Sequence, residues 1–498
     1  MRLTAFEASN FKSIGPHGAR IEFAPVTVLV GENGAGKTSL LEALAFVGQR
    51  ARSLGKFSLE GEFVKFGSHD DYVFGTDKAA QVRTVATFSV QKSELEGYTQ
   101  LHDEMQRGAR SWSADVDRLG LKEKPTRGLS KDQVGDMLAG IQLRSSSLAS
   151  GNEPIMAEFT IDSGGQRRTA SVTVGSSGVL WRADNRGAAD GRLFIAGEHE
   201  PYQYAVNHAE VIEPLMDKHF SYAEQGPPFT LAAAVEGRGT RVIDQGNFPN
   251  ELRTKLRLYR LLEDGIVDAL QRIYYLSAPR GRLSSLVPAG ETMDWVGHSA
   301  EDLARFLTNL QGDPSKKDVA DVVRHWAKEF GIDSLNAASR GRPELHLDYV
   351  DEKLKVSLGA QGLGYGSSQI LPIIAQGFAA PPGSVLLIEE PEISLHPNAQ
   401  IKLMDMIAEM VKQDKRLVLT THSATVLMGL GRLLRKPNEL KAADIRVYEV
   451  TKQESGSDVR KLRVNEHGYV EGWVDSFGHA TRQLLDAYVE SVPMHEKD

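Results

Sequence analysis

The feature that most constrains the fold is a glycine-rich loop between an apolar strand and a helix. The stretch LVGENGAGKTSLLEAL spans residues 29–44. Gly31 is followed by four residues and then by Gly36, Lys37 and Thr38, which is the spacing of a P-loop. Such a loop needs a strand before it and a helix after it, because backbone N–H groups surround a phosphate at the helix N-terminus. The sequence therefore predicts an α/β protein that binds a nucleotide.

The residue types in this loop predict how ATP and its metal are held. Lys37 is expected to reach the β- and γ-phosphates, and the hydroxyl of Thr38 to ligate Mg²⁺. The nucleotide-binding residues predicted from the loop are Asn33, Gly34, Ala35, Gly36, Lys37, Thr38 and Ser39.

Two carboxylates follow a second apolar strand, in the stretch SVLLIEEPEISLHP at 384–397. Glu389 is predicted to serve the metal together with Thr38, and Glu390 to polarise the attacking water. Pro391 stops the strand, so both acids are held at its carboxyl end, where α/β folds bind ligands. The alternative interpretation is a pair of solvated carboxylates after a core strand.

A third apolar strand ends in a histidine, in the stretch RLVLTTH at 416–422. This strand is expected to deliver His422 to the same edge of the sheet as the two glutamates. There the imidazole can donate a hydrogen bond to the γ-phosphate and sense its presence. The alternative is a histidine that caps the end of the strand.

A second glycine-rich stretch, GAQGLGYGSSQILPII at 359–374, precedes the Glu-Glu strand. Residues 367–369 are predicted to cap a helix that begins near Ile370, with Pro372 in its first turn. This would make another helix N-terminus suited to an anion. Since the P-loop already has its own helix, the economical geometry places two nucleotides between two subunits. A plain glycine-rich hinge is the alternative.

The hydrophobic pattern divides the chain into three parts. Residues 1–200 are expected to form the first part of the ATPase head, with a polar excursion at about 94–154. Residues 201–343 have a mainly helical pattern, and α/β patterning returns over 344–498. The predicted fold class is α/β, with a mixed or parallel sheet that carries the P-loop, an antiparallel β-lobe and a large, mainly helical insertion.

Composition indicates which partners and which cellular compartment to expect. The net charge of −8 argues against a surface that is basic throughout, so contact with DNA would need a local patch. The chain has no cysteine, which excludes thiolate metal sites and disulfides and fits the cytoplasm. The sequence contains no run of about 18 apolar residues, and its N-terminus lacks the apolar region of a secretory signal. We expect a cytoplasmic protein with no membrane span.

Together these motifs resemble the head of an ABC-type ATPase: a P-loop at 31–38, a signature-like GYGSSQ, a Walker B strand LLIEE and a switch histidine. Four further strings, NFKSIG, EEPEISLHPNAQ, YLSAPRG and HGYVEGWVDSF, resemble the OLD/RecF-like group of AAA-annotated ATPases (OLD, overcoming lysogenisation defect). Members without a Toprim domain occur in phage-defence systems such as PARIS or Septu. The resemblance covers roughly residues 1–95 and 345–480.

The resemblance implies a head-to-head homodimer closed by ATP, or a higher oligomer, that acts with a separate effector such as a nuclease or toxin. Glu390 would be the catalytic base, supported by Lys37 and His422. The trans contacts to the γ-phosphate would be Ser368 and Gln369. Two further residues would lie near the nucleotide, Lys12 and Ser13. The loop 394–397 would communicate between the two sites, and 65–74 would replace the usual Q-loop.

Two positions depart from the pattern of the wider class. Glu389 stands where many members have Asp, which predicts slow turnover. The signature reads Gly-Ser-Ser-Gln rather than Ser-Gly-Gly-Gln, which puts the trans contact in doubt.

No built-in nuclease is expected. A Toprim centre needs a Glu and an Asp-x-Asp pair to hold its metal. After His422 only 76 residues remain, and they contain no Asp-x-Asp. Residues 115–117 have that spacing but lie in the polar excursion, with no apolar strand before them. If the system cuts nucleic acid, the nuclease is expected on another protein.

Three functions compete at this stage. The first is an antiphage sensor and scaffold that detects a phage component, such as a protein, and controls an effector. The second is a DNA repair clamp related to RecF or Rad50. The missing heptads argue against Rad50 arms, whereas a RecF-like clamp needs a basic face, for which the candidates are Arg253, Lys255, Arg257 and Arg260, or Lys122, Lys124, Arg127 and Lys131. The third, the nucleotide-binding subunit of a transporter, is disfavoured by the large insertion and the signature.

Overall fold

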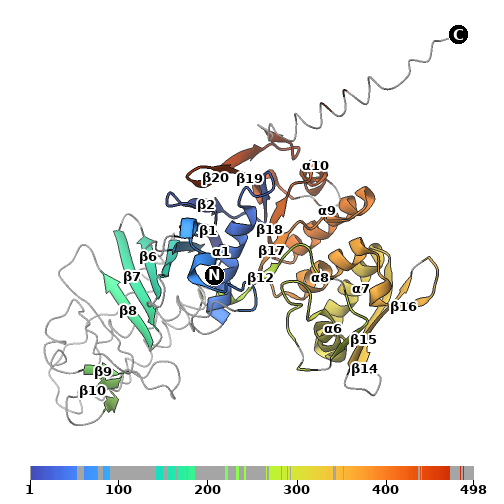
Figure 1. Cartoon of the computed structure of the whole chain (residues 1–498), viewed down its shortest axis with the longest axis horizontal. Helices are drawn as coiled ribbons and strands as arrows, with labels where there is room; N and C mark the ends of the chain where they lie inside the picture. The colour runs from blue at the N-terminus through green and yellow to red at the C-terminus, as the bar shows by residue number, and fades with distance from the viewer. Residues whose placement is uncertain are drawn as a thin grey trace, which may run out of the picture. The chain divides into compact units, whose positions relative to one another are not determined.

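Figure 1 shows the computed structural model of the chain. The structure describes residues 2–52, 61–76 and 82–89, the strands at 142–149, 155–163, 166–175, 178–184, 219–221, 232–234 and 240–242, and residues 265–471 except 266, 267, 282, 289, 292, 340–343, 352, 436, 437 and 439, together with 483 and 486. The chain forms two compact units. The P-loop unit consists of Ser13–Gln49, Glu60–Lys65 and Arg272–Asp498, and the β unit of Met1–Lys12, Arg50–Leu59 and Phe66–Gln271.

The P-loop unit is built on a mixed sheet of seven strands. Their order is β12 (Ile273–Leu276), β17 (Val385–Glu389), β18 (Arg416–Thr421), β3 (Val26–Val30), β19 (Ile445–Gln453), β20 (Gly456–Val464) and β21 (Val470–Glu471). The first five strands are parallel, and the last two add antiparallel pairs. Every residue of β3 and β17 is buried, as expected for parallel strands that are covered on both faces. The strands predicted before the P-loop, before the Glu-Glu pair and before His422 therefore meet in one sheet.

Helices cover both faces of this sheet. One face, which includes Val28 and Ile388, belongs to a large apolar core shared with α8 (Tyr365–Ala379), α9 (Pro397–Lys412) and α10 (Ala424–Leu433). Leu29 and Leu387 alternate with those residues and are equally buried. Figure 1 places α1 (Lys37–Arg52) on the other side of the sheet from α8 and α9.

A smaller layer packs beside α8. It consists of α6 (Leu303–Gly312), α7 (Lys317–Glu329) and an antiparallel sheet of β13 (Leu286–Pro288), β15 (Glu344–Asp351), β14 (Ile332–Ser339) and β16 (Ser357–Gly359). Trp326 of α7 stacks on Phe378 of α8 with ring centroids 6.0 Å apart. Among its described residues, the part predicted as mainly helical, 201–343, thus holds strands such as β14 beside α6 and α7.

The β unit contains an antiparallel sheet in the order β1 (Arg2–Ser9), β4 (Val82–Ser89), β5 (Gln142–Ala149), β6 (Ile155–Ser163), β7 (Gln166–Gly175) and β8 (Gly178–Asp184). Three short strands, β9 (His219–Ser221), β10 (Ala232–Ala234) and β11 (Thr240–Val242), form a second sheet. Only β5 of the predicted polar excursion lies within the described residues. The two candidate basic patches and residues 115–117 lie outside them.

The remaining short elements complete the described chain. β2 (Ala19–Glu22) belongs to the P-loop unit, where the N–H of Glu22 donates to Oη of Tyr448 at 2.9 Å. The 3₁₀ turns are His69–Asp71, Phe74–Thr76, Pro314–Lys316, Ala360–Gly362 and Ala442–Asp444. No helix among the residues described is long and apolar enough to cross a membrane.

The observed sheets confirm the predicted α/β class, with a mixed sheet that carries the P-loop and a separate antiparallel lobe. The start of α8 differs from the prediction. This helix begins at Tyr365 rather than near Ile370, and its N-cap is Gly364, so residues 367–369 lie in its first turns and do not cap it. Pro372 then lies inside the helix, where it cannot donate to the carbonyl of Ser368.

The burial of β17 predicts a large loss of stability when a cavity is made in it. Leu386 of β17 is fully buried in the core between β12 and β18. Leu386→Ala should lower the free energy of unfolding by about 2–5 kcal/mol, because it removes apolar contacts and leaves a cavity. Urea denaturation followed by tryptophan fluorescence measures this loss. The matched control is Leu286→Ala, since Leu286 lies in a strand but is 49% exposed. A comparable loss in both variants would contradict the assigned core.

Candidate nucleotide-binding site

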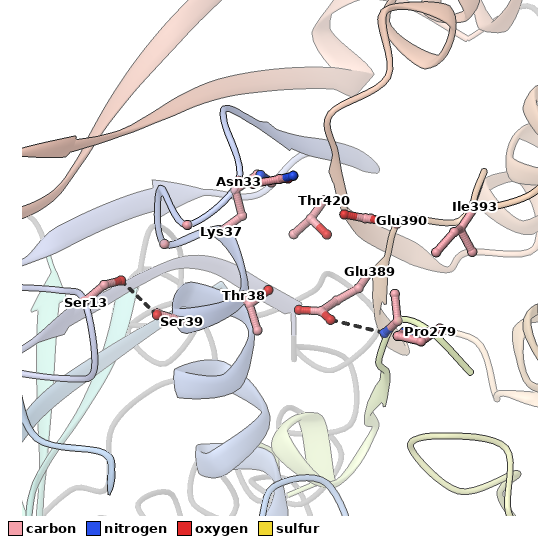
Figure 2. Close-up of a pocket in the computed structure, with 13 residues that line it drawn as sticks. Ser13, Asn33, Lys37, Thr38, Ser39, Pro279, Glu389, Glu390, Ile393 and Thr420 are labelled. Atoms are coloured by element: carbon pink, nitrogen blue, oxygen red, sulfur yellow. Dashed lines mark hydrogen bonds between the residues drawn. The ribbon is translucent and has the colours of Figure 1, made fainter. Parts of the chain in front are cut away.

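A cavity of about 280 Å³ lies at the carboxyl ends of β3 and β17. The residues that line it are Ser13, Asn33, Gly34, Gly36, Lys37, Thr38, Ser39, Ala278, Pro279, Glu389, Glu390, Ile393 and Thr420. Nine of these were predicted from sequence as site residues, from the P-loop, the segment before it and the Glu-Glu pair. Figure 2 shows Lys37 and Thr38 on one side and Glu389 and Glu390 on the other.

Glycines shape the P-loop for physical reasons. Gly34 and Gly36 have φ values of 76° and 108°, a region that L side chains rarely adopt. A Cβ on Gly36 would lie 2.0 Å from Oγ of Ser457 and 2.5 Å from Oγ of Ser13. A Cβ on Gly31 would lie 2.1 Å from the carbonyl oxygen of Val450. The loop therefore tolerates no side chain at 31 or 36.

Lys37 is held against its own loop. Its Nζ donates to the carbonyls of Gly31 and Glu32 at 2.8 and 2.9 Å. Burial lowers the pKa of this ammonium, and the charges of nearby Glu390 and Glu389 oppose that shift. A phosphate in the cavity would supply the negative charge that a buried ammonium favours.

Hydrogen bonds among three serine hydroxyls, those of Ser13, Ser39 and Ser457, connect the P-loop to β20. Oγ of Ser13 donates to Oγ of Ser39 at 2.8 Å, and Ser457 lies 2.8 Å from Ser13. Ser457 Oγ also lies within hydrogen-bonding distance, 2.7 Å, of the carbonyl of Ala35. Ser13 was predicted from the sequence but Ser457 was not, because a lone serine at the start of a distant strand carries no spacing signal.

Glu389 fits the metal side of the site. It is 6% exposed, and burial raises the pKa of its carboxyl, while the Thr38 hydroxyl and the Ala278 N–H lower it. The N–H of Ala278 donates to Oε2 at 3.2 Å, whereas the buried Oε1 accepts no hydrogen bond of ordinary length. Figure 2 shows the carboxylate facing Thr38. These oxygens are of the kind Mg²⁺ takes together with phosphate oxygens, so Thr38 and Glu389 are suited to hold it.

No larger acidic cluster competes for this role. Within the part of the chain that the structure describes, no group of three or more His, Cys, Asp and Glu side chains is placed to hold a metal. Mg²⁺ commonly binds through one or two carboxylates plus substrate phosphates. The metal predicted for this site would therefore depend on the nucleotide for much of its coordination.

Glu390 and His422 form a pair at the edge of the cavity. Nδ1 of His422 lies 2.9 Å from Oε1 of Glu390. Glu390 has a φ of 39°, in the left-handed region, and its N–H donates to the carbonyl of Thr420 at 3.0 Å. Glu390 lines the cavity, whereas His422 does not and is nearly half exposed. His422 therefore contacts the predicted site indirectly, through Glu390, the candidate base.

Two buried residues near the acids were missed. The pKa of Glu392 is raised by burial, although the hydroxyl of Thr421 donates to it and lowers the pKa. Arg280, in the segment between β12 and β13, is buried as well, and burial lowers the pKa of its guanidinium to about 10 despite the charge of Glu389. Arg280 lies in the string YLSAPRG, which was predicted only to resemble a family motif. An isolated arginine predicts no role by itself.

Besides His422, four predicted site residues lie apart from the cavity lining. Ala35 is buried within the loop. Lys12 belongs to the β unit, where its Nζ lies 5.1 Å from the centroid of the Phe66 ring. Ser368 donates to the carbonyl of Tyr365, and Gln369 is fully buried. A trans contact from Ser368 or Gln369 would therefore require the first turns of α8 to change.

Comparison with known proteins supports the ATPase class. Residues 233–429 match a family described as an AAA domain, putative AbiEii toxin, type IV TA system, and residues 7–139 match a second AAA domain family. Each match covers less than half of the chain. No curated protein matches the sequence. The P-loop cavity and the two AAA matches together indicate a nucleotide-binding ATPase.

Among solved structures, the chain is similar to heads of SMC proteins. An SmcHead bound to the C-winged helix domain of ScpA has 12% identity and a TM-score of 0.42, covering 93% of this chain and 99% of that one. An Smc head with an extended coiled coil bound to the C-terminal domain of ScpA, from Pyrococcus furiosus, has 13% identity and a TM-score of 0.38, covering 98% and 99%. The SMC head domain from Thermotoga maritima has 11% identity and a TM-score of 0.32, covering 93% and 100%.

The first prediction for the site concerns Lys37. Lys37→Ala should weaken ATP binding by about 100-fold, because a charged hydrogen-bond donor to the phosphates is lost. Titration with a fluorescent ATP analogue measures the affinity. The control is Lys402→Ala, since Lys402 is an exposed lysine paired with Glu329. Equal affinity in Lys37→Ala and the wild type would show that the cavity is not the phosphate site.

Proposed function

We propose that the chain binds and slowly hydrolyses ATP in a head-to-head dimer and acts as a sensor and scaffold that controls a separate effector, in antiphage defence. The observation that carries the ATPase part is the convergence of Lys37, Thr38 and the Glu389–Glu390 pair on one cavity, from segments more than 300 residues apart. In this proposal the ammonium of Lys37 and the hydroxyl of Thr38 serve the phosphates and the metal, and the two carboxylates serve the metal and the attacking water.

Each side chain has a separate task in the proposed reaction. Bound Mg²⁺ would neutralise charge on the β- and γ-phosphates, and Thr38 and Glu389 would hold it. Lys37 stabilises the charge that develops on the transferred phosphoryl group. Glu390 orients the attacking water and accepts its proton, and His422 holds the carboxylate at 2.9 Å. The longer side chain of Glu389, in place of Asp, supports slow turnover.

The dimer is supported by the exposed start of α8. Tyr365 is 41% exposed, and Gly364 beside it is exposed as well. A Cβ on Gly366 would lie 2.5 Å from the carbonyl oxygen of Ser394, so the start of α8 packs against the 394–397 loop. A second subunit that contacts α8 would therefore press on the loop that follows the two acids.

The second part of the proposal is that the ATPase cycle controls an effector. ATP would bind the closed dimer more tightly than the open one and so shift the population towards closure. Hydrolysis would remove the γ-phosphate contacts and release the closed state. The family match whose description names a putative AbiEii toxin of a type IV TA system supports a setting of this kind. A RecF- or Rad50-like DNA clamp uses the same ATPase cycle and is the alternative.

Glu390→Gln tests the assigned base. The variant should bind ATP normally, lower kcat by about 100-fold or more because the proton acceptor is lost, and accumulate as a dimer with ATP. Phosphate release and light scattering after gel filtration measure the two effects. The matched control is Glu466→Gln, a carboxylate that is 87% exposed. Hydrolysis by Glu390→Gln at the wild-type rate would refute the assignment.

The same variant identifies the partner. Tagged Glu390→Gln protein is recovered from its native host with and without ATP, treated with DNase and analysed by mass spectrometry. An ATP-dependent nuclease or toxin that survives DNase treatment is the expected result. Recovery of DNA together with repair proteins, lost after DNase, would replace the effector scaffold by the DNA clamp.

A further inference from the structure

A guanidinium is buried behind the nucleotide cavity. Arg280 lies in the segment after β12, and its side chain is 1% exposed, the largest one buried to that degree among the described residues. Burying a charge is unfavourable unless hydrogen bonds replace the lost water. The position therefore requires partners, and these are backbone carbonyls.

The guanidinium of Arg280 joins three segments of the chain. Its hydrogen bonds run from Nε to the carbonyl of Gln369 at 2.7 Å, from Nη1 to the carbonyls of Ser277 and Glu389 at 2.9 Å each, and from Nη2 to the carbonyl of Glu390 at 3.1 Å. Only the planar fork of an arginine offers this many donors in fixed directions. A lysine can keep the charge but cannot reach all four carbonyls.

The backbone of Arg280 and the side chain of Gln369 complete the connection. The N–H of Arg280 donates to Oε1 of Gln369 at 2.7 Å, and Nε2 of Gln369 donates to the carbonyl of Arg280 at 2.6 Å. Gln369 has no exposed surface. Both the oxygen and the nitrogen of its side-chain amide are thus hydrogen-bonded to Arg280. These bonds fix α8 to the segment after β12.

The same contacts reach the strained residue of the site. Glu390 has a φ of 39°, and such a conformation persists only where the surroundings hold it. The Thr420 carbonyl holds its N–H, and Arg280 holds its carbonyl. The direction of the Glu390 side chain therefore depends on the guanidinium.

We propose that Arg280 is a positioning residue for ATP hydrolysis, which couples the first turns of α8 to the backbone of Glu389 and Glu390. A contact that moves α8, such as docking of a second subunit, then changes the position of Glu390. This inference rests on the proposed ATPase function. Arg280 does not line the cavity, so it acts on the rate of hydrolysis rather than on nucleotide binding.

A purely structural role would have different consequences, and the chain offers a matched control. Lys415 is a second buried cation that binds a carbonyl of α8, at the opposite end of the helix. Its Nζ donates to the carbonyl of Phe378 at 3.0 Å and to Oε1 of Gln413 at 2.7 Å. Loss of Lys415 should lower stability without changing hydrolysis by the folded protein.

The experiment compares Arg280→Lys with Lys415→Met in the full chain. Steady-state phosphate release gives kcat, titration with a fluorescent ATP analogue gives Kd, and thermal denaturation gives Tm. Arg280→Lys should lower kcat by about 10- to 100-fold, since a small displacement of a catalytic group costs this much, while Kd stays within about threefold of the wild type. Lys415→Met should lower Tm and leave kcat per bound nucleotide unchanged.

A second variant covers a failure of Arg280→Lys to fold. Gln369→Leu keeps the guanidinium but removes both bonds to the Arg280 backbone, and it should lower kcat with the same unchanged Kd. Wild-type kcat in either folded variant, or a fall of kcat and bound nucleotide in equal proportion, would overturn the role of Arg280 and leave the ATPase intact. A wild-type chain that hydrolyses no ATP would refute the proposed function, and this inference with it.

Discussion

The parallel pairing of β3, β17 and β18 is the constraint on which the site depends. Parallel strands align their carboxyl ends at one edge of a sheet, so polar residues that follow each strand meet there. The P-loop follows β3, Glu389 ends β17 with Glu390 directly after it, and His422 follows β18. Sequence positions near 37, 389 and 422 are thereby brought together without any local contact between them. The buried apolar strands supply the energy that holds this edge in place.

Buried charge is the second feature that determines the structure of the site. Burial lowers the pKa of Lys37 and Arg280, and the charges of nearby glutamates oppose that shift. Burial raises the pKa of Glu389 and Glu392, and hydrogen bonds from the hydroxyls of Thr38 and Thr421 oppose it. Neither cation relies on a carboxylate alone, because both donate to backbone carbonyls. The carboxylates are less well satisfied, since Oε1 of Glu389 and Oε2 of Glu392 accept no hydrogen bond of ordinary length. A magnesium–nucleotide complex suits such a site, since it offers both a cation and anionic oxygens.

Sequence was sufficient where a motif has fixed spacing or a strand has a clear end. The P-loop, the strand before Glu389 and the strand before His422 were predicted close to their observed bounds. Sequence was insufficient where a side chain binds a backbone carbonyl. Arg280 and Ser457 both do so. Because every residue has a carbonyl, the sequence does not indicate which one a side chain binds. The early start of α8 was missed because its N-cap is a glycine, which has no side chain to signal the cap.

The position of Gln369 limits how a second subunit can complete the site. Its amide is fully buried and hydrogen-bonded at both ends to Arg280, so it cannot reach another nucleotide while those bonds persist. The exposed surface at the start of α8 belongs instead to Gly364 and Tyr365. Gly366, next in sequence, packs against Ser394 in the loop after the two acids. In the proposed dimer, a contact that moves the start of α8 would therefore reach the acids by two routes, through Ser394 and through Arg280. Neither route would require Gln369 to leave the core.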